Sequence, residues 1–194
     1  MELIGIFFVG CGLLVLAGVA KAVRPNETAR ALILLLPGSN QRSPSYNVTR
    51  QAVRVGALLE AGLGMSALLF PRTVTAALVA VSYTVFACIT AFARRQGGAL
   101  STCGCFGRPD TPSTGLHVVI NMVFVATAVA LALQPPHYTT LVSLLENQPW
   151  DGVPLLLASG VGVWLTYLAL SPLAALEAAH RLVAGTTKRE ALST

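Results

Sequence analysis

Long apolar stretches, separated by clusters of charged residues, constrain this chain more than any other feature. Charged residues make up 11% of its 194 residues, against roughly 25% in ordinary soluble domains, so a soluble fold would lack a charged exterior. Only the second stretch contains an Asp, Glu, Lys or Arg, namely Glu60. The stretches cover residues 3–20, 55–70, 73–93, 114–133 and 153–176. The sequence therefore predicts an integral membrane protein.

The lengths of these stretches predict helices that cross a bilayer. A helix needs about 20 residues at 1.5 Å each to span the hydrocarbon core, and 55–70 reaches that length only if Ala52, Val53 and a snorkelling Arg54 are included. Helices satisfy their own backbone polar groups in lipid, and no stretch alternates as a barrel strand does. We therefore expect an all-α polytopic membrane helix bundle. Its parts would be a four-helix domain over 1–134, an outer loop over 135–152, a fifth transmembrane helix over 153–176 and a cytoplasmic tail over 177–194.

The basic residues predict the orientation of this bundle in the cell membrane. Apart from Arg72, every Lys and Arg lies between the first and second stretches, between the third and fourth, or after the fifth. The positive-inside rule makes these segments cytoplasmic, so we expect the N-terminus outside and the C-terminus inside. The net charge of +5 then reflects topology and gives no reason to expect a nucleic-acid partner.

Two further segments of the first half have an expected role. A short interfacial helix is predicted over 27–36, between the first two spans. A cleaved signal peptide over 1–22 is the competing interpretation of the first stretch. We disfavour it because the chain begins Met1-Glu2, without the positive n-region that such a peptide carries.

The chemistry that the sequence offers is concentrated in Cys103-Gly104-Cys105, in the predicted inner loop between the third and fourth spans. Glycine between two cysteines allows a small, strained disulfide, and strained, exposed disulfides tend to be the labile, catalytic ones. The arginines that flank this loop would favour the thiolate form. We interpret the pair as a redox-active dithiol, with two unreactive loop cysteines as the alternative. A metal site would need about four ligands, and His117 adds only a third, so no metal is expected.

The remaining cysteines lie within the predicted spans. Cys88 is six residues from Arg94, about 9 Å below the inner boundary at helical rise, and is a candidate resolving thiol for the exchanging pair. Cys11 lies near the middle of the first span, where a buried cysteine is usually a small apolar side chain.

Polar residues at a similar depth predict one pocket in the inner third of the bilayer. Glu60 and Asn121 each lie about 9 to 10 Å inside the inner boundary. Lys21 closes the first span with a stem long enough to reach Glu60, and His117 shares a helix face with Asn121. Acids inside the membrane are usually retained for a function. The alternative is a structural Lys21–Glu60 pair plus an interhelical hydrogen bond from Asn121.

We expect Glu60 to lie on a helix face made thin by glycines. Gly56, Glu60 and Gly64 follow one another at intervals of four residues, which places them on one side of a helix. Another helix could then press closely against this side.

These residues together resemble the MauE group of DoxX-like membrane proteins. The resemblance covers about residues 1–134 and depends on Lys21, Leu35-Leu36-Pro37, 59–64, Cys-Gly-Cys-Phe-Gly at 103–107 and Asn121. It implies a redox-associated four-helix membrane protein. The namesake acts in methylamine utilisation, where it works with a thioredoxin-like partner to mature the disulfide-rich small subunit of methylamine dehydrogenase. By position, Cys103 and Cys105 would be the exchanging pair.

Two classes of function follow from the sequence. In the first, thiol–disulfide exchange or electron transfer through the Cys-Gly-Cys loop supports maturation of a partner, either a thioredoxin-like protein or a disulfide-containing client. If the client lies outside the cell, electrons must cross the bilayer to or from the cytoplasmic loop. A bound quinone is a candidate electron acceptor for this step, and a route through Cys88 and the polar pocket is the alternative. In the second, the chain is a non-enzymatic membrane subunit or a small-molecule or lipid carrier with a polar pocket around Glu60.

Overall fold

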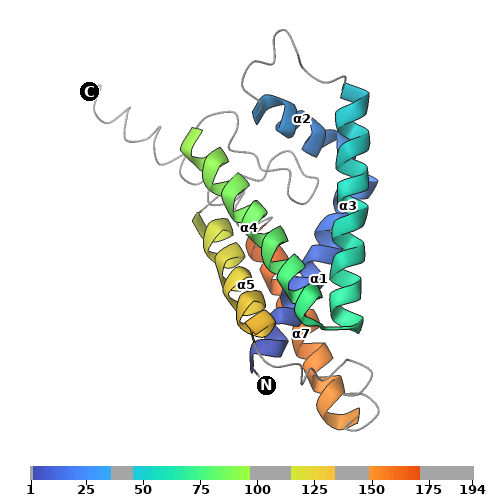
Figure 1. Cartoon of the computed structure of the whole chain (residues 1–194), viewed down its shortest axis with the longest axis vertical. Coiled ribbons are helices and arrows are strands. Elements are labelled where there is room, and N and C mark those ends of the chain that lie inside the picture. The colour runs from blue at the N-terminus through green and yellow to red at the C-terminus, as the bar shows by residue number, and fades with distance from the viewer. Residues whose placement is uncertain (1, 36–45, 97–114, 134–148, 171–194) are drawn as a thin grey trace, which may run out of the picture.

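The computed structural model describes residues 2–35, 46–96, 115–133 and 149–170, and all regular structure within these ranges is helical. The predicted all-α polytopic bundle is thereby confirmed. Its helices are α1 (Glu2–Val23), α2 (Pro25–Leu35), α3 (Tyr46–Leu69), α4 (Thr73–Gln96), α5 (Gly115–Leu133) and α7 (Pro149–Leu170). In Figure 1 the five long helices alternate in direction along the chain, as successive membrane crossings do.

Five of these helices are long and apolar enough to cross a membrane. The candidate spans are Leu3–Val23, Tyr46–Leu69, Thr73–Arg95, Gly115–Leu133 and Gly152–Leu170. Each overlaps one of the five apolar stretches of the sequence, and the protein is a multi-pass membrane protein of the class that the sequence predicts. The last residues of the predicted fifth span, 171–176, lie outside the described part of the chain.

The second span is much longer than its apolar stretch. The helix α3 begins at Tyr46 and therefore contains Arg50 and Arg54, both of which are exposed. Arginine stems can run along an apolar surface while the charged group reaches water, so these charges do not end the helix. The preceding helix α2 spans Pro25–Leu35 and confirms the predicted short helix, which begins two residues earlier than expected, at a proline suited to a first helical position.

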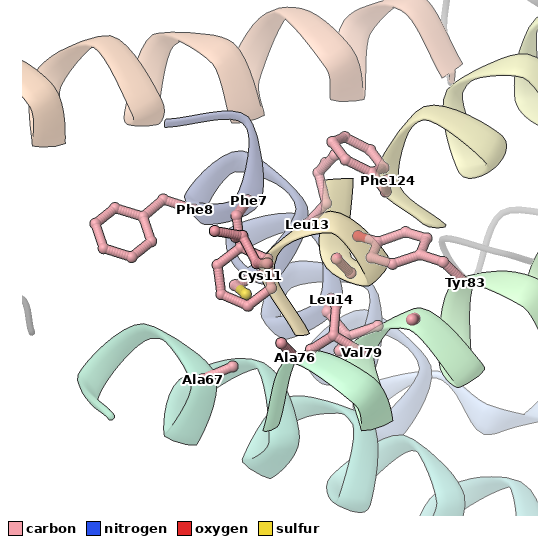
Figure 2. Packing of buried hydrophobic residues seen from close by; sticks show 13 residues of the cluster. Phe7, Phe8, Cys11, Leu13, Leu14, Ala67, Ala76, Val79, Tyr83 and Phe124 are labelled. Carbon is pink, nitrogen blue, oxygen red and sulfur yellow. The ribbon is translucent and has the colours of Figure 1, made fainter. Parts of the chain in front are cut away.

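The core lies where α1, α4 and α5 meet. Its largest fully buried side chains include Phe8, Leu14 and Val79, and Cys11 is also fully buried, as the prediction of a small apolar role requires. Figure 2 shows these side chains of α1 and α4 together with Phe124 of α5. The Tyr83 hydroxyl donates a hydrogen bond of 2.5 Å to the Gly10 carbonyl oxygen and so ties α4 to α1.

Glycines allow α1 and α3 to pack closely. A methyl group built on Gly18 would lie 2.6 Å from the Ala57 carbonyl oxygen, and one on Gly64 would lie 2.8 Å from the Cys11 carbonyl oxygen. Close backbone approach at small residues is a general way of joining helices in lipid. The expectation that Gly56 shares this role is wrong, because nothing lies within 4 Å of a methyl group built there.

Basic side chains are concentrated at one end of the bundle. Among the described residues, every Lys and Arg except Arg72 lies toward the end where α1 and α4 terminate and where α3 begins. This is also the end that carries α2 (Figure 1). Arg72 lies in the turn between α3 and α4, at the opposite end.

Candidate functional site

An ion pair lies within the apolar spans. Lys21 Nζ donates a hydrogen bond of 2.7 Å to Glu60 Oε2, which confirms that Lys21 reaches Glu60. The side chain of Lys21 is 9% exposed and that of Glu60 is 23% exposed. The ammonium group also lies 4.5 Å from the centroid of the Phe86 ring, at a distance suited to a cation–π interaction.

The close packing of α1 and α3 explains why these two charges meet. Gly18 precedes Lys21 by about one turn, and Ala57 precedes Glu60 by the same interval. A methyl group on Gly18 would overlap the backbone of Ala57 and Ala61, so the two helix backbones are nearly in contact one turn from the ion pair. The short lysine–carboxylate distance therefore depends on the absence of a side chain at Gly18.

A cavity of about 50 Å³ lies next to Lys21. Among the described residues, its lining includes the nitrogen-bearing polar side chains of Lys21 from α1 and of His117 and Asn121 from α5. The rest of the wall is apolar or aromatic and comes from α1, α4, α5 and α7: Leu13, Leu14, Ala17, Tyr83, Phe86, Phe124 and Leu170. Of the four residues predicted to form a polar pocket, the structure places three around this cavity. Glu60 does not line it and is joined to it through Lys21.

Histidine 117 joins the start of α5 to the end of α7. Its Nε2 lies 3.0 Å from the Leu170 carbonyl oxygen, and the side chain is buried. Because a carbonyl oxygen only accepts, Nε2 carries the hydrogen and donates it. Sequence reasoning missed this contribution of α7, since any backbone carbonyl can accept such a bond and none carries a local sequence signal.

Asn121 lies one turn deeper than His117 and is half-buried. Its side-chain amide makes no hydrogen bond to any residue that the structure describes, so the interhelical bond considered as an alternative is absent within those ranges. An amide has two N–H donors and an acceptor oxygen. Asn121 therefore gives the cavity a polar wall whose hydrogen-bonding capacity is open to a ligand or water.

Of the cysteines predicted to act in redox chemistry, the structure describes only Cys88, and this residue is separate from the cavity. Cys88 is exposed on α4 and is not among the residues that line the cavity, so its side chain faces the bundle exterior. Cys103 and Cys105 lie outside the described residues. Within the described ranges, no group of three or more His, Cys, Asp or Glu side chains could hold a metal ion.

Aromatic residues of α4 and α5 complete the cavity wall, and the sequence analysis did not predict them. The rings of Tyr83 and Phe124 lie with their centroids 4.9 Å apart, side by side in Figure 2. Tyr83 and Phe86 meet edge to face at 5.9 Å. Such pairs stabilise packing beyond the area that they bury, and here they form the apolar side of a cavity whose other side is polar.

Comparison with known proteins identifies one family. No curated protein and no solved structure matches the chain. The family model described as methylamine utilisation protein MauE matches residues 2–134, a range that includes α1 to α5 and therefore the ion pair and most of the cavity wall. The chain belongs to the MauE family of membrane proteins.

Proposed function

We propose that this MauE-family protein supports the maturation of a partner protein by thiol–disulfide exchange at Cys103 and Cys105. The proposal is supported by the family's described role in methylamine utilisation and by the Cys-Gly-Cys sequence between α4 and α5. Whether the client belongs to methylamine metabolism is a separate question, because relatives that share a fold and a motif need not share a substrate.

The observation that carries this proposal is how the segment with both cysteines is anchored. It leaves α4 at Gln96 and enters α5 at Gly115, and these two helices form one of the most extensive contacts of the bundle. A methyl group on Gly115 would lie 2.9 Å from Arg94 Nη1, so a guanidinium group lies at the point where the segment returns. Positive charge of this kind favours the thiolate that starts an exchange.

The proposed step is an exchange of two electrons and two protons. The thiolate of one cysteine attacks a client disulfide and expels a client thiolate, and the second cysteine then attacks the mixed disulfide and releases the reduced client. Cys103 and Cys105 end as a disulfide, which a thioredoxin-like dithiol reduces again. In the oxidising direction, client dithiols reduce this disulfide, and a quinone accepts the two electrons and two protons that restore it. The exposure of Cys88 on the outside of α4 favours a quinone in the lipid over a relay through Cys88 and the pocket.

A mixed disulfide tests this exchange directly. With Cys105→Ser, the second attack cannot occur, so we expect a covalent complex with the partner that accumulates in cells and disappears on reduction. Non-reducing electrophoresis followed by mass spectrometry of the complex measures it. The matched control is Cys88→Ser, which should trap nothing. If neither Cys103→Ser nor Cys105→Ser gives a reducible complex, and the double variant retains full activity in cells, the proposal is wrong.

We further propose that the Cys103–Cys105 segment faces the cytoplasm, because the basic end of the bundle would lie inside under the positive-inside rule. In intact cells of a Cys11→Ala, Cys88→Ala background, a membrane-permeant maleimide should then modify Cys103 and Cys105, whereas an impermeant one should not. Arg72→Cys, at the opposite end, serves as the control that the impermeant reagent reaches. Labelling of Cys103 and Cys105 by the impermeant reagent, with Arg72→Cys protected from it, would reverse the orientation.

The cavity supports a second candidate function, that of a small-molecule or lipid carrier or a non-enzymatic subunit. The specific observation is the Asn121 amide, which lines the cavity and has no hydrogen bond to the described residues. The two functions are separated by variants that each affect one site. Loss of activity in Cys103→Ser, Cys105→Ser supports the redox role, whereas loss in Asn121→Leu with both cysteines intact supports the carrier role.

A further inference from the structure

The cavity beside Lys21 has a polar end and an apolar end. Lys21 lies in the last turn of α1, His117 lies close to the start of α5, and Leu170 is the last residue of α7, so the polar lining is near the helix ends. Leu13 lies about 12 Å deeper along α1, and Phe124 about 10 Å deeper along α5, at helical rise. A ligand that matched both ends would be amphiphilic, with its polar group toward the helix ends.

The polar end offers hydrogen-bond donors. An ammonium group has three N–H donors, and Lys21 uses one on Glu60. The Asn121 amide adds two more and contributes an acceptor oxygen. His117 donates its Nε2 hydrogen to Leu170. The polar group of the ligand must therefore contain an oxygen that accepts from Lys21 and Asn121, as a hydroxyl or a carbonyl does.

Charge and size narrow the class of ligand. Among the described residues that line the cavity, Lys21 is the only lysine, arginine or acid. The Glu60 carboxylate, 2.7 Å away, already balances its positive charge. A carboxylate ligand would add a second negative charge beside one ammonium group, and an alkylammonium ligand would meet that group directly, both in a medium of low dielectric constant. A volume of about 50 Å³ holds roughly three to five water-sized groups at about 10–15 Å³ each.

We propose that this cavity binds a small uncharged amphiphile, such as a short alcohol or amide. Its oxygen would lie between Lys21 and Asn121, and its carbon chain would point toward Leu13, Tyr83 and Phe124. The proposal names the ligand class for the second candidate function and does not involve Cys103 or Cys105. The two proposals can therefore fail separately.

The test uses 3-azibutanol, a photoreactive four-carbon alcohol, with the full-length protein in nanodiscs. We expect labelling of the peptides that contain Ala17 to Lys21 and His117 to Phe124, and we expect excess butan-1-ol to reduce it at least about fivefold. Asn121→Leu should reduce it by a similar factor, which corresponds to the loss of about one hydrogen bond. Met122→Leu, at a neighbouring position with an exposed side chain, is the matched control and should label as the wild type does.

Three results would overturn the proposal. Labelling that is equal in the wild type, Asn121→Leu and Met122→Leu, and that resists butan-1-ol, would show only partition of the probe into lipid. Competition by butylammonium or butyrate as strong as that by butan-1-ol would contradict an uncharged ligand. Competition by dioleoylglycerol but not by butan-1-ol would assign the site to a lipid headgroup.

A second variant, Ala17→Val, fills part of the cavity with two added methyl groups. It should reduce labelling even if Asn121→Leu is unstable.

Discussion

Replacing Lys21 by Met is expected to lower the free energy of unfolding by about 3 kcal/mol. Met has a similar length and removes only the charge and its hydrogen bond, so the Glu60 carboxylate remains among apolar helices without its partner. Removing one member of a buried ion pair costs about 3–5 kcal/mol. We expect the low end of that range because the Glu60 side chain keeps 23% of its exposure. Reversible unfolding in mixed micelles, compared between variant and wild type, measures this loss.

Two further variants test whether this loss comes from the unpaired Glu60 charge: Glu60→Gln, and the double variant Lys21→Met, Glu60→Gln. Glu60→Gln should cost less, about 1–2 kcal/mol, because the Lys21 ammonium keeps the Phe86 ring at 4.5 Å and its stem can extend toward the nearby helix end. The double variant Lys21→Met, Glu60→Gln should come within about 1 kcal/mol of the wild type, since replacing a whole buried pair is often nearly neutral. A double variant as unstable as Lys21→Met would mean that the pair contributes through packing and not through charge.

Hydropathy could predict the membrane fold because the physical requirement is local. Each span must bury its own side chains in hydrocarbon and satisfy its own backbone, so the five apolar stretches correspond to five helices. The same criterion failed at the start of α3. Absence of charge defined the predicted stretch, whereas Arg50 and Arg54 lie within the helix as exposed residues. A charge near the end of a span limits the apolar stretch but does not end the helix.

Residue depth could be predicted, whereas the direction of a side chain around its helix could not. Lys21 and Glu60 lie at matching depths, and the structure joins them. Depth alone indicates a role for Cys88 near the pocket, whereas its side chain faces outward. Gly56 and Gly64 are eight residues apart, which at about 100° per residue leaves them roughly 80° apart around α3. Of these two glycines, only Gly64 therefore lies against α1. The cavity depends on such directions in four helices at once, so the sequence predicted its polar members but not its aromatic wall.

Gly18→Ala is the second substitution for which we expect a large effect, a loss of about 2 kcal/mol in the free energy of unfolding. The added methyl group would lie 2.6 Å from the Ala57 carbonyl oxygen and 2.7 Å from the Ala61 nitrogen. Both are backbone atoms, so α1 and α3 must move apart. Overpacking of this kind costs about 1–3 kcal/mol.

Gly62→Ala is the matched control, because nothing lies within 4 Å of its added methyl group. It should leave stability unchanged or raise it by up to about 1 kcal/mol, since alanine favours the helix.

The same substitution also tests whether close packing holds the ion pair together. Gly18 lies one turn from Lys21, so separating α1 from α3 there should lengthen the contact between Lys21 and Glu60. Gly18→Ala should therefore cost at least about 0.5 kcal/mol less in the Lys21→Met, Glu60→Gln background than in the wild type, as coupled neighbouring sites do. Equal costs in both backgrounds would show that the ion pair forms independently of the glycine contact. Unfolding measurements on the four proteins of this cycle, made under one set of conditions, decide between these outcomes.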